Sequence, residues 1–200
     1  MYAAHVDIGN RGSFFPLGVL SESAFKQQFA ETGFWQKEEG TLLISAADTP
    51  LAGHIEFFKP VGYWDAFELS YQLYDQQFAG RGRVSEAVQL MADYLFAVKK
   101  QYRIQLDIVP ENAASRRIAE KCGFQLEGTA RGAFFNAGRN QDLLIYSLLR
   151  DDPRGEADYW ADRLTDQSVE SARSRSSPSR IRSSPNANST SSSHRPSTPS

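Results

Sequence analysis

The segment Gln77-Phe78-Ala79-Gly80-Arg81-Gly82-Arg83-Val84-Ser85-Glu86-Ala87 carries more information about this 200-residue chain than any other. It stands between a run of alternating polar and apolar residues and a run with the periodicity of an amphipathic helix. Two glycines separated by one residue allow a tight turn and a close approach of the backbone to a ligand. The N–H groups and the positive dipole end of the following helix point into that turn. The segment therefore predicts a phosphate or pyrophosphate site.

Three classes of nucleotide site use glycine loops of this kind. A P-loop requires a Lys-Ser or Lys-Thr pair after the glycines, and this chain has none there. A Rossmann NAD(P) loop would place Ser85 at the third glycine position and Asp107 near the ribose-binding acid. However, residues 67–73 alternate polar and apolar side chains, unlike the continuous apolar run of a buried parallel strand. The third class is coenzyme A, and the sequence downstream supports it.

Residues 112–124 read Asn-Ala-Ala-Ser-Arg-Arg-Ile-Ala-Glu-Lys-Cys-Gly-Phe. The glycine segment resembles the Gln/Arg-x-x-Gly-x-Gly/Ala loop of the GNAT superfamily of acyl-CoA N-acyltransferases. The second segment resembles the Asn-x-x-Ser-x-x-x-x-Glu-Lys-x-Gly-Phe helix of its RimJ/RimL branch, which contains protein N-terminal and small-amine acetyltransferases. Residues 127–131 and 143–149 are similar to the closing pair of strands in that branch. The resemblance covers residues 21–150.

The resemblance implies an α+β fold in which a central, mostly antiparallel mixed sheet is flanked by helices. It implies an acetyl-CoA-dependent N-acetyltransferase, in which a primary amine attacks the thioester directly through a tetrahedral intermediate. Neither a covalent enzyme intermediate nor a metal is required. Acetyl-CoA is then a co-substrate, and the acceptor is a protein N-terminus or a small amine. Two alternatives stay open, a non-catalytic coenzyme A-binding or interaction module and a Rossmann-like NAD(P)-binding protein.

The glycine segment is expected to hold the pyrophosphate through its backbone N–H groups. Arg81 and Arg83 would add charge, because a guanidinium group can clamp phosphate oxygens through two donors. The alternative for each arginine is a solvated surface charge, and the alternative for Ser85 is a helix cap. The residues expected to bind the cofactor are Gln77, Phe78, Ala79, Gly80, Arg81, Gly82, Arg83, Val84, Ser85, Asn112 and Ser115.

Glu68 and Ser115 are the expected catalytic residues. Glu68 lies on the polar side of the segment that runs into the glycine loop, where the resemblance implies a carboxylate that takes a proton from the amine. Burial would raise its pKa toward neutrality, and Glu56 and His54 are the fallbacks. Ser115 and Asn112 match family positions near the pantetheine arm and the thiolate. Asn112 would cap its helix, and the positive helix end would stabilise a thiolate.

The acceptor side is the least defined part of the sequence. His54, Phe134 and Phe135 are the candidates for substrate contacts, and Phe134, Phe135 and Asn136 are expected in a glycine-flanked loop between the last strands. Tyr146 is a further hydroxyl candidate, with core packing as the alternative. Nothing in the sequence distinguishes a ribosomal-protein terminus from a polyamine, an amino acid or an aminoglycoside.

Composition predicts one domain and an appendage. Residues 1–150 are expected to form the GNAT-type domain, residues 151–170 a polar C-terminal extension and residues 171–200 a disordered tail. The tail contains thirteen serines, four prolines and five arginines but no acidic residue, so it buries too little apolar surface to fold. Without those five charges, 17 basic residues face 24 acidic ones, a formal charge of −7 that suits a cationic acceptor.

No apolar run approaches the ~20 residues that span a membrane, and residues 1–7 lack the basic start and apolar core of a signal peptide. We therefore expect a cytoplasmic monomer or homodimer without membrane or nucleic-acid partners. The single cysteine, Cys122, is expected in the core, and no Cys/His cluster predicts a metal site.

Local patterns predict helices at residues 21–34, 84–98 and 113–122, and strands at residues 41–46, 51–58, 67–73, 103–108 and 143–149. Residues 2–8 show only a faint strand pattern, whereas the family normally begins with a strand and a helix. The leading strand is therefore degenerate or absent, and its loss would expose an edge of the sheet.

Overall fold

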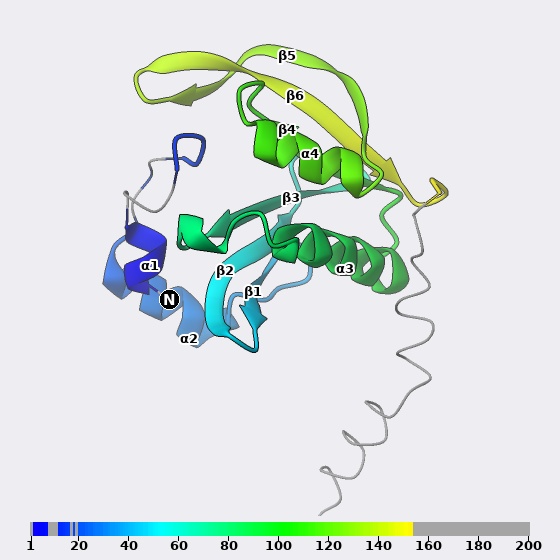
Figure 1. The fold of residues 1–200 in the computed structure, drawn as a ribbon. Coiled ribbons are helices and arrows are strands. Elements are labelled where there is room, and N and C mark those ends of the chain that lie inside the picture. The colour runs from blue at the N-terminus through cyan, green and yellow to red at the C-terminus, as the bar shows by residue number, and fades with distance from the viewer. Residues whose placement is uncertain (1, 8–11, 17, 19, 154–200) are drawn as a thin grey trace, which may run out of the picture. The chain divides into compact units, whose positions relative to one another are not determined.

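The computed structural model describes residues 2–7, 12–16, 18 and 20–153, all within the unit Met1–Trp160. The tail expected at residues 171–200 and most of the expected extension lie outside these residues. Figure 1 shows the strands and the helices around them. The strands are β1 (Gly40–Ala46), β2 (Thr49–Phe58), β3 (Ala66–Leu73), β4 (Arg103–Ile108), β5 (Gln125–Asn136) and β6 (Arg139–Leu149). The helices are α1 (Tyr2–Val6), α2 (Glu22–Thr32), the 3-10 helix η1 (Gln76–Phe78), α3 (Arg83–Val98) and α4 (Ala113–Lys121).

The six strands form one mixed sheet in the order β1-β2-β3-β4-β6-β5. Every neighbouring pair is antiparallel except β3 and β4, which are parallel and are joined through α3. A parallel pair needs a long crossover connection, and a helix commonly provides it. This arrangement confirms the mostly antiparallel α+β fold that the sequence predicts.

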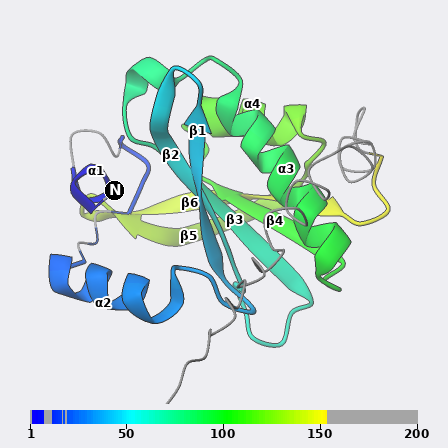
Figure 2. The same cartoon turned by 90° about the horizontal axis from the view of Figure 1, so that it is seen from below.

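Helices cover both faces of the sheet. Helices α3 and α4 pack side by side on one face, and α2 lies on the other (Figure 2). The core lies beneath α3 and α4, where strand residues meet an apolar stripe of α3. That stripe consists of Val84, Val88, Met91 and Leu95, and all four are buried. Burial of such side chains contributes about 1.5–3 kcal/mol each.

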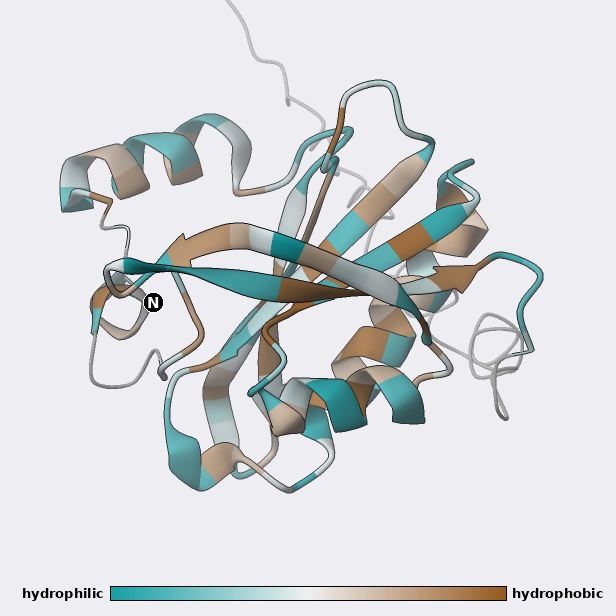
Figure 3. Ribbon diagram, turned by 90° about the horizontal axis from the view of Figure 1, so that it is seen from above, coloured by the Kyte–Doolittle hydropathy of each residue, from teal (hydrophilic) through white to brown (hydrophobic). Residues whose placement is uncertain are grey.

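Side chains point alternately to the two faces of the sheet, and Figure 3 shows hydrophilic and hydrophobic residues following one another along the strands. In β3, Phe67 and Leu69 join the core, whereas Glu68 and Ser70 point to the face that carries α2. We call this second face the polar face. The alternation in residues 67–73 therefore reports a strand with two different environments, as the sequence predicts.

The N-terminal segment differs from the expected faint strand, because residues 2–6 form the helix α1. The ring of Tyr2 packs on Phe25 of α2 at a centroid distance of 5.4 Å, and its hydroxyl donates to the carbonyl of Leu20. An aromatic anchor of this kind favours the short helix over an extended edge strand. In the described part of the chain, β1 and β5 are the outer strands of the sheet.

The last hairpin corrects the expected loop at Phe134, Phe135 and Asn136. These residues belong to β5, whose pairing with β6 continues to Asn136 and Arg139. The turn consists of Ala137 and Gly138, whose φ angles are 50° and 79°. Positive φ at both central residues is the requirement of a two-residue type I′ hairpin turn. The ladder therefore extends beyond the residues that the sequence pattern marked as strand.

Strands β3 and β4 pair over three residues only. The register joins Ala66 to Arg103, Phe67 to Ile104 and Glu68 to Gln105, and it ends there although both strands continue. Beyond Glu68, the strand β3 keeps its other partner, β2, as far as Leu73. The sheet is therefore open between β3 and β4 on the side toward the glycine loop.

A substitution at Gly53 would test how closely the backbones of β2 and β3 approach each other. A Cβ atom at Gly53 would lie 2.1 Å from the backbone oxygen of Gln72, which cannot move without breaking the ladder. We expect Gly53→Ala to lower the free energy of unfolding by about 3 kcal/mol, measured by urea denaturation. Gly62→Ala is the control, because a Cβ there meets nothing within 4 Å. Equal stability of the two variants would contradict the close packing.

Candidate active site

A cavity of about 920 Å³ occupies the opening between β3 and β4. It is lined by β3 from Glu68 to Leu73, by β4 and its following residues from Leu106 to Val109, by the glycine loop, by the first turns of α4 and by residues 12–16. Backbone N–H and C=O groups of the two separated strands face this space, where they lack each other as partners. The cavity therefore offers strand-like hydrogen bonding to an extended ligand.

The glycine loop forms one end of this cavity. Gly80 and Gly82 have φ angles of 74° and 77°, and a Cβ at either residue meets nothing within 4 Å. Their left-handed backbone, and not a lack of space, is what requires glycine. Gly82 caps α3 without a side-chain hydrogen bond, so the first N–H groups of α3 are free of a capping side chain. These N–H groups are available to an anion, and the phosphate site at this helix end stays a prediction.

The N-cap of α3 is Gly82 and not Ser85, so the helix-cap alternative for Ser85 is wrong. Ser85 is the third residue of the helix and is buried, and its carbonyl accepts a hydrogen bond from the Cys122 thiol at 3.5 Å. Cys122 is buried as expected, and this burial raises its thiol pKa to about 11. A thiol with that pKa stays protonated and packs as an apolar group.

Arg81 and Arg83 both contact Asp48, in the turn between β1 and β2. Arg81 lies 3.2 Å from one carboxylate oxygen and Arg83 lies 2.5 Å from the other. The Arg83 hydrogen bond lowers the pKa of Asp48. Asp48 therefore holds both guanidinium groups beside the loop, and both arginines line the cavity. Of the remaining loop residues, Gln77 is turned away, because its backbone and side-chain N–H groups donate to Asp75.

Two cations of α4 line the same cavity and were missed in the sequence. Arg117 and Lys121 are four residues apart, so they lie on one face of α4. Their four-residue spacing within residues 112–124 was the sequence signal that could have identified them. Together with the arginines of the glycine loop, they make this end of the cavity cationic.

The beginning of α4 places a hydroxyl group in the cavity. The side chain of Asn112 caps α4 by accepting a hydrogen bond from the Ser115 backbone N–H at 3.1 Å, as predicted. Ser115 lines the cavity next to Tyr71 of β3. Burial raises the pKa of Tyr71 to about 12, and the Ser115 hydroxyl opposes this shift. Tyr71 was missed because its place in the alternation indicated a core residue.

Glu68 lies where the opening between the strands begins, on the polar face. Burial raises its pKa to about 7, and the neighbouring carboxylates Asp107 and Glu56 add to the shift. Asp107 belongs to a hydrogen-bonded chain, in which Arg103 donates to Gln105 at 2.9 Å and Gln105 donates to Asp107 at 2.8 Å. Glu68 is thus a carboxyl group that can take up a proton near neutral pH.

The structure does not bring all the expected substrate residues to the cavity. His54 is 2% exposed, its Nδ1 lies 2.9 Å from the Tyr74 hydroxyl, and it is not among the lining residues. Phe134 does line the cavity, whereas Phe135, its neighbour on β5, points to the opposite side and is 69% exposed. Tyr146 is buried in the core, in agreement with the packing alternative.

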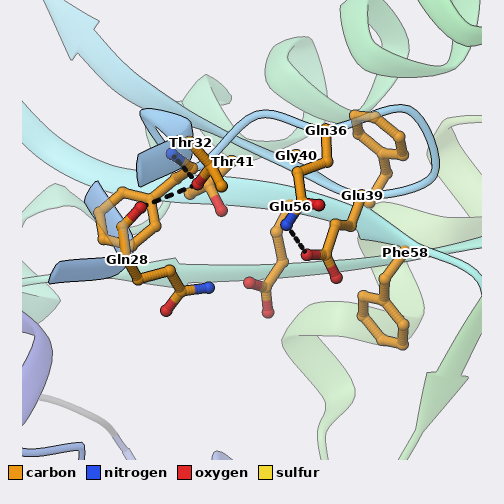
Figure 4. Close-up of a pocket in the computed structure, with 10 residues that line it drawn as sticks. Gln28, Thr32, Gln36, Glu39, Gly40, Thr41, Glu56 and Phe58 are labelled. Carbon is orange, nitrogen blue, oxygen red and sulfur yellow. Dashed lines mark hydrogen bonds between the residues drawn. The ribbon is translucent and has the colours of Figure 1, made fainter. Parts of the chain in front are cut away.

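A second pocket of about 170 Å³ lies between α2 and the polar face of β1 and β2 (Figure 4). It contains Glu39 and Glu56, and the charge of Glu39 adds to the burial that raises the pKa of Glu56. The amide of Gln36 donates to Glu39 at 2.6 Å.

Within the described part of the chain, no group of three or more His, Cys, Asp or Glu residues could hold a metal ion. None of the described helices has the length and apolar character needed to cross a membrane.

The described residues thus form an α+β domain in which the parallel pair β3 and β4 is open beside the N-terminal end of the helix α3 that connects them. The family model described as "Acetyltransferase (GNAT) domain" matches residues 9–125. The chain belongs to this family.

Two curated relatives come from Bacillus subtilis (strain 168). The protein named probable N-acetyltransferase YjcK is 33% identical over 111 residues, which are 55% of this chain and 61% of that protein. YdaF, whose name provisionally assigns it to the ribosomal N-acetyltransferases, is 31% identical over 96 residues, 48% of each chain. The chain thus spans between about half and three fifths of the length of these two relatives.

Solved structures share the fold. Spermidine N-acetyltransferase from Vibrio cholerae in complex with CoA and spermine superposes with a TM-score of 0.64 at 20% identity, covering 76% of this chain and 89% of that chain. Ribosomal-protein-S5-alanine acetyltransferase from Vibrio fischeri gives a TM-score of 0.59 at 19% identity, covering 76% and 90%.

The raised pKa of Glu68 has a cost in stability. Below pH 4.5 the carboxyl is protonated in both the folded and unfolded states, whereas above about pH 7 it is ionised in both. Between these values only the unfolded chain loses the proton, so the folded state loses roughly 3 kcal/mol as the pH rises. We expect Glu68→Gln to be more stable than the wild type at pH 8 and about equally stable at pH 4, measured by urea denaturation. A pH-independent difference would contradict the shift.

Proposed function

We propose that this chain is an acetyl-CoA-dependent N-acetyltransferase that transfers the acetyl group directly to a primary amine. One observation carries the proposal. A single cavity has a cationic anion-binding loop at one end and a carboxyl group with a pKa of about 7 at the other. Acetyl-CoA has phosphates at one end and the reactive thioester at the other, so the two ends of the cavity fit the two ends of this substrate.

Coenzyme A fits the residues present. The N–H groups at the start of α3 would hold the pyrophosphate, and Arg81, Arg83, Arg117 and Lys121 would neutralise phosphate charge. Beyond Glu68, the backbone N–H and C=O groups of β3 and β4 do not pair with each other. They would hydrogen-bond instead to the amide groups of the pantetheine arm. On binding, the two arginines of the loop would contact phosphate oxygens and lose all or part of their contact with Asp48.

Glu68 would act as the base. An amine is protonated near neutral pH, and it must lose a proton before its nitrogen can attack. With a pKa of about 7, Glu68 is ionised in a large share of molecules and binds the proton well enough to remove it. Its neighbours Glu56 and Asp107 make the polar face acidic, and this charge would attract the cationic acceptor.

Ser115 and Tyr71 would act at the leaving group. Their hydroxyl groups line the cavity next to each other, beside the N-terminal end of α4. A thiolate that departs there gains from the positive helix end and can accept a proton from one of these hydroxyls. Ser115 was the expected residue, and Tyr71 is added because it shares this position.

The acceptor class is a protein N-terminus or a small amine. Both are represented among the relatives and structural neighbours by name, as ribosomal-protein and spermidine acetyltransferases. The acidic polar face is compatible with either, because both present a cationic amine.

Glu68→Gln tests the role of the base. We expect kcat at saturating amine to fall about 100-fold or more, with the dissociation constant of acetyl-CoA unchanged, because the side chain lies away from the phosphate loop. The wild-type kcat should rise with pH and level off above about pH 7, since protonated Glu68 cannot accept a proton. Turnover that is unaltered in the variant would remove Glu68 from the mechanism.

Calorimetric titration with acetyl-CoA, NAD and NADP tests the cofactor. We expect binding of acetyl-CoA alone, weakened about tenfold in Gly82→Ala, because alanine strains the left-handed loop. The control is Gly138→Ala, which has the same left-handed backbone in the β5–β6 turn but does not line the cavity. Binding of a dinucleotide alone would favour the Rossmann alternative. Acetyl-CoA binding without turnover of any amine would favour a non-catalytic coenzyme A-binding module.

A further inference from the structure

Gln72 presents an unusual polar group to the cavity. It lies in β3, is 4% exposed and lines the space between β3 and β4. Neither its amide nitrogen nor its amide oxygen has a hydrogen-bond partner among the described residues. A buried polar atom without a partner lowers the stability of the folded state, and groups of this kind are rare in native proteins. A bound ligand would remove this cost.

Gln72 lies on the acceptor side of the cavity. Side chains two residues apart along a strand share a face, so Gln72 follows Glu68 and Ser70 on the polar face of β3. The residue opposite Gln72 on β2 is His54, whose ring is engaged by Tyr74. The glycine loop leads instead into α3, on the other face of the sheet. The Gln72 amide therefore faces the side from which an acceptor would approach Glu68.

The chemistry of a carboxamide restricts what it can recognise. It offers N–H donors and a carbonyl acceptor side by side, so its full complement is a group that also has both, such as a peptide bond or a primary amide. An aliphatic polyamine has ammonium donors and methylene groups only, and it would leave the amide N–H groups of Gln72 without an acceptor. Sites built to hydrogen-bond a substrate discriminate strongly against analogues that lack the matching group.

We propose that Gln72 is a specificity-determining residue that binds an amide group next to the reacting amine, so that the preferred acceptor is a peptide N-terminus or an amino-acid amide and not a polyamine. This proposal rests on the proposed acetyltransferase function. The division of roles follows from the positions on β3: Glu68 receives the proton of the amine, and Gln72 fixes the neighbouring amide.

The test compares two acceptors of similar shape, alaninamide and 1,2-dimethylpropylamine, which carries an isopropyl group in place of the carboxamide. We expect the ratio of their kcat/KM values to fall about 10- to 100-fold in Gln72→Met relative to the wild type. The ratio cancels the difference in basicity between the amines, which is the same for both proteins. The KM for acetyl-CoA should not change. Gln89→Met, at an exposed position of α3, is the control and should keep the wild-type ratio.

Two results would overturn the proposal: an unchanged ratio in Gln72→Met, which includes an equal loss for both acceptors, or a loss of acetyl-CoA affinity, which would assign Gln72 to the pantetheine arm. Gln72→Glu, which keeps the shape but loses the amide donors, should also lose selectivity and serves if Gln72→Met is unstable. Titration of the CoA-saturated protein with both amines repeats the comparison without turnover. Selective binding of alaninamide that is lost in Gln72→Met supports the proposal even if no acetyl transfer is found, whereas equal binding of both amines contradicts it.

Discussion

The short parallel pairing of β3 and β4 is the constraint on which the site depends. Three residue pairs hold the strands together, and beyond Glu68 each strand keeps only its outer neighbour. The resulting opening creates the cavity, places Glu68 where the strands part and leaves the glycine loop at the far end. Because α3 connects the same two strands, its N-terminal end necessarily faces the opening. One local feature of the sheet therefore positions both the anion site and the carboxyl group.

Charge is separated along this cavity. Cations from the glycine loop and from α4 gather at one end, and the carboxyl groups of Glu56, Glu68 and Asp107 gather on the polar face. Two oppositely charged substrates can then approach from different sides without competing for the same groups. Asp48 modifies this pattern, because its single negative charge offsets part of the charge of Arg81 and Arg83. The Asp48 side chain is 57% exposed, so solvent weakens both contacts.

Local features were predictable from the sequence, and features set by strand geometry were not. The glycine loop, the Asn112 cap and the alternation that places Glu68 on the polar face all follow from residues close together in the chain. The separation of β3 and β4 does not, because it depends on the register of strands more than thirty residues apart. For the same reason Gln72 was not predicted as a site residue, and His54 and Phe135 were assigned to a cavity that their side chains do not reach. A pattern of period two gives the face of a side chain but not what stands opposite it.

Two side chains on the polar face of β3 lower the stability of the folded chain, and this destabilisation is itself an argument for function. Glu68 has its pKa raised by burial beside two other carboxylates, and two residues past Ser70 the amide of Gln72 is buried without a partner among the described residues. Neither arrangement benefits the fold, since an apolar residue at either position would cost less. Both unfavourable groups line one cavity, on one face of one strand. Local conflicts that converge in this way are expected where a ligand supplies the missing interactions, and the two groups together describe that ligand as a cation with an amide beside it.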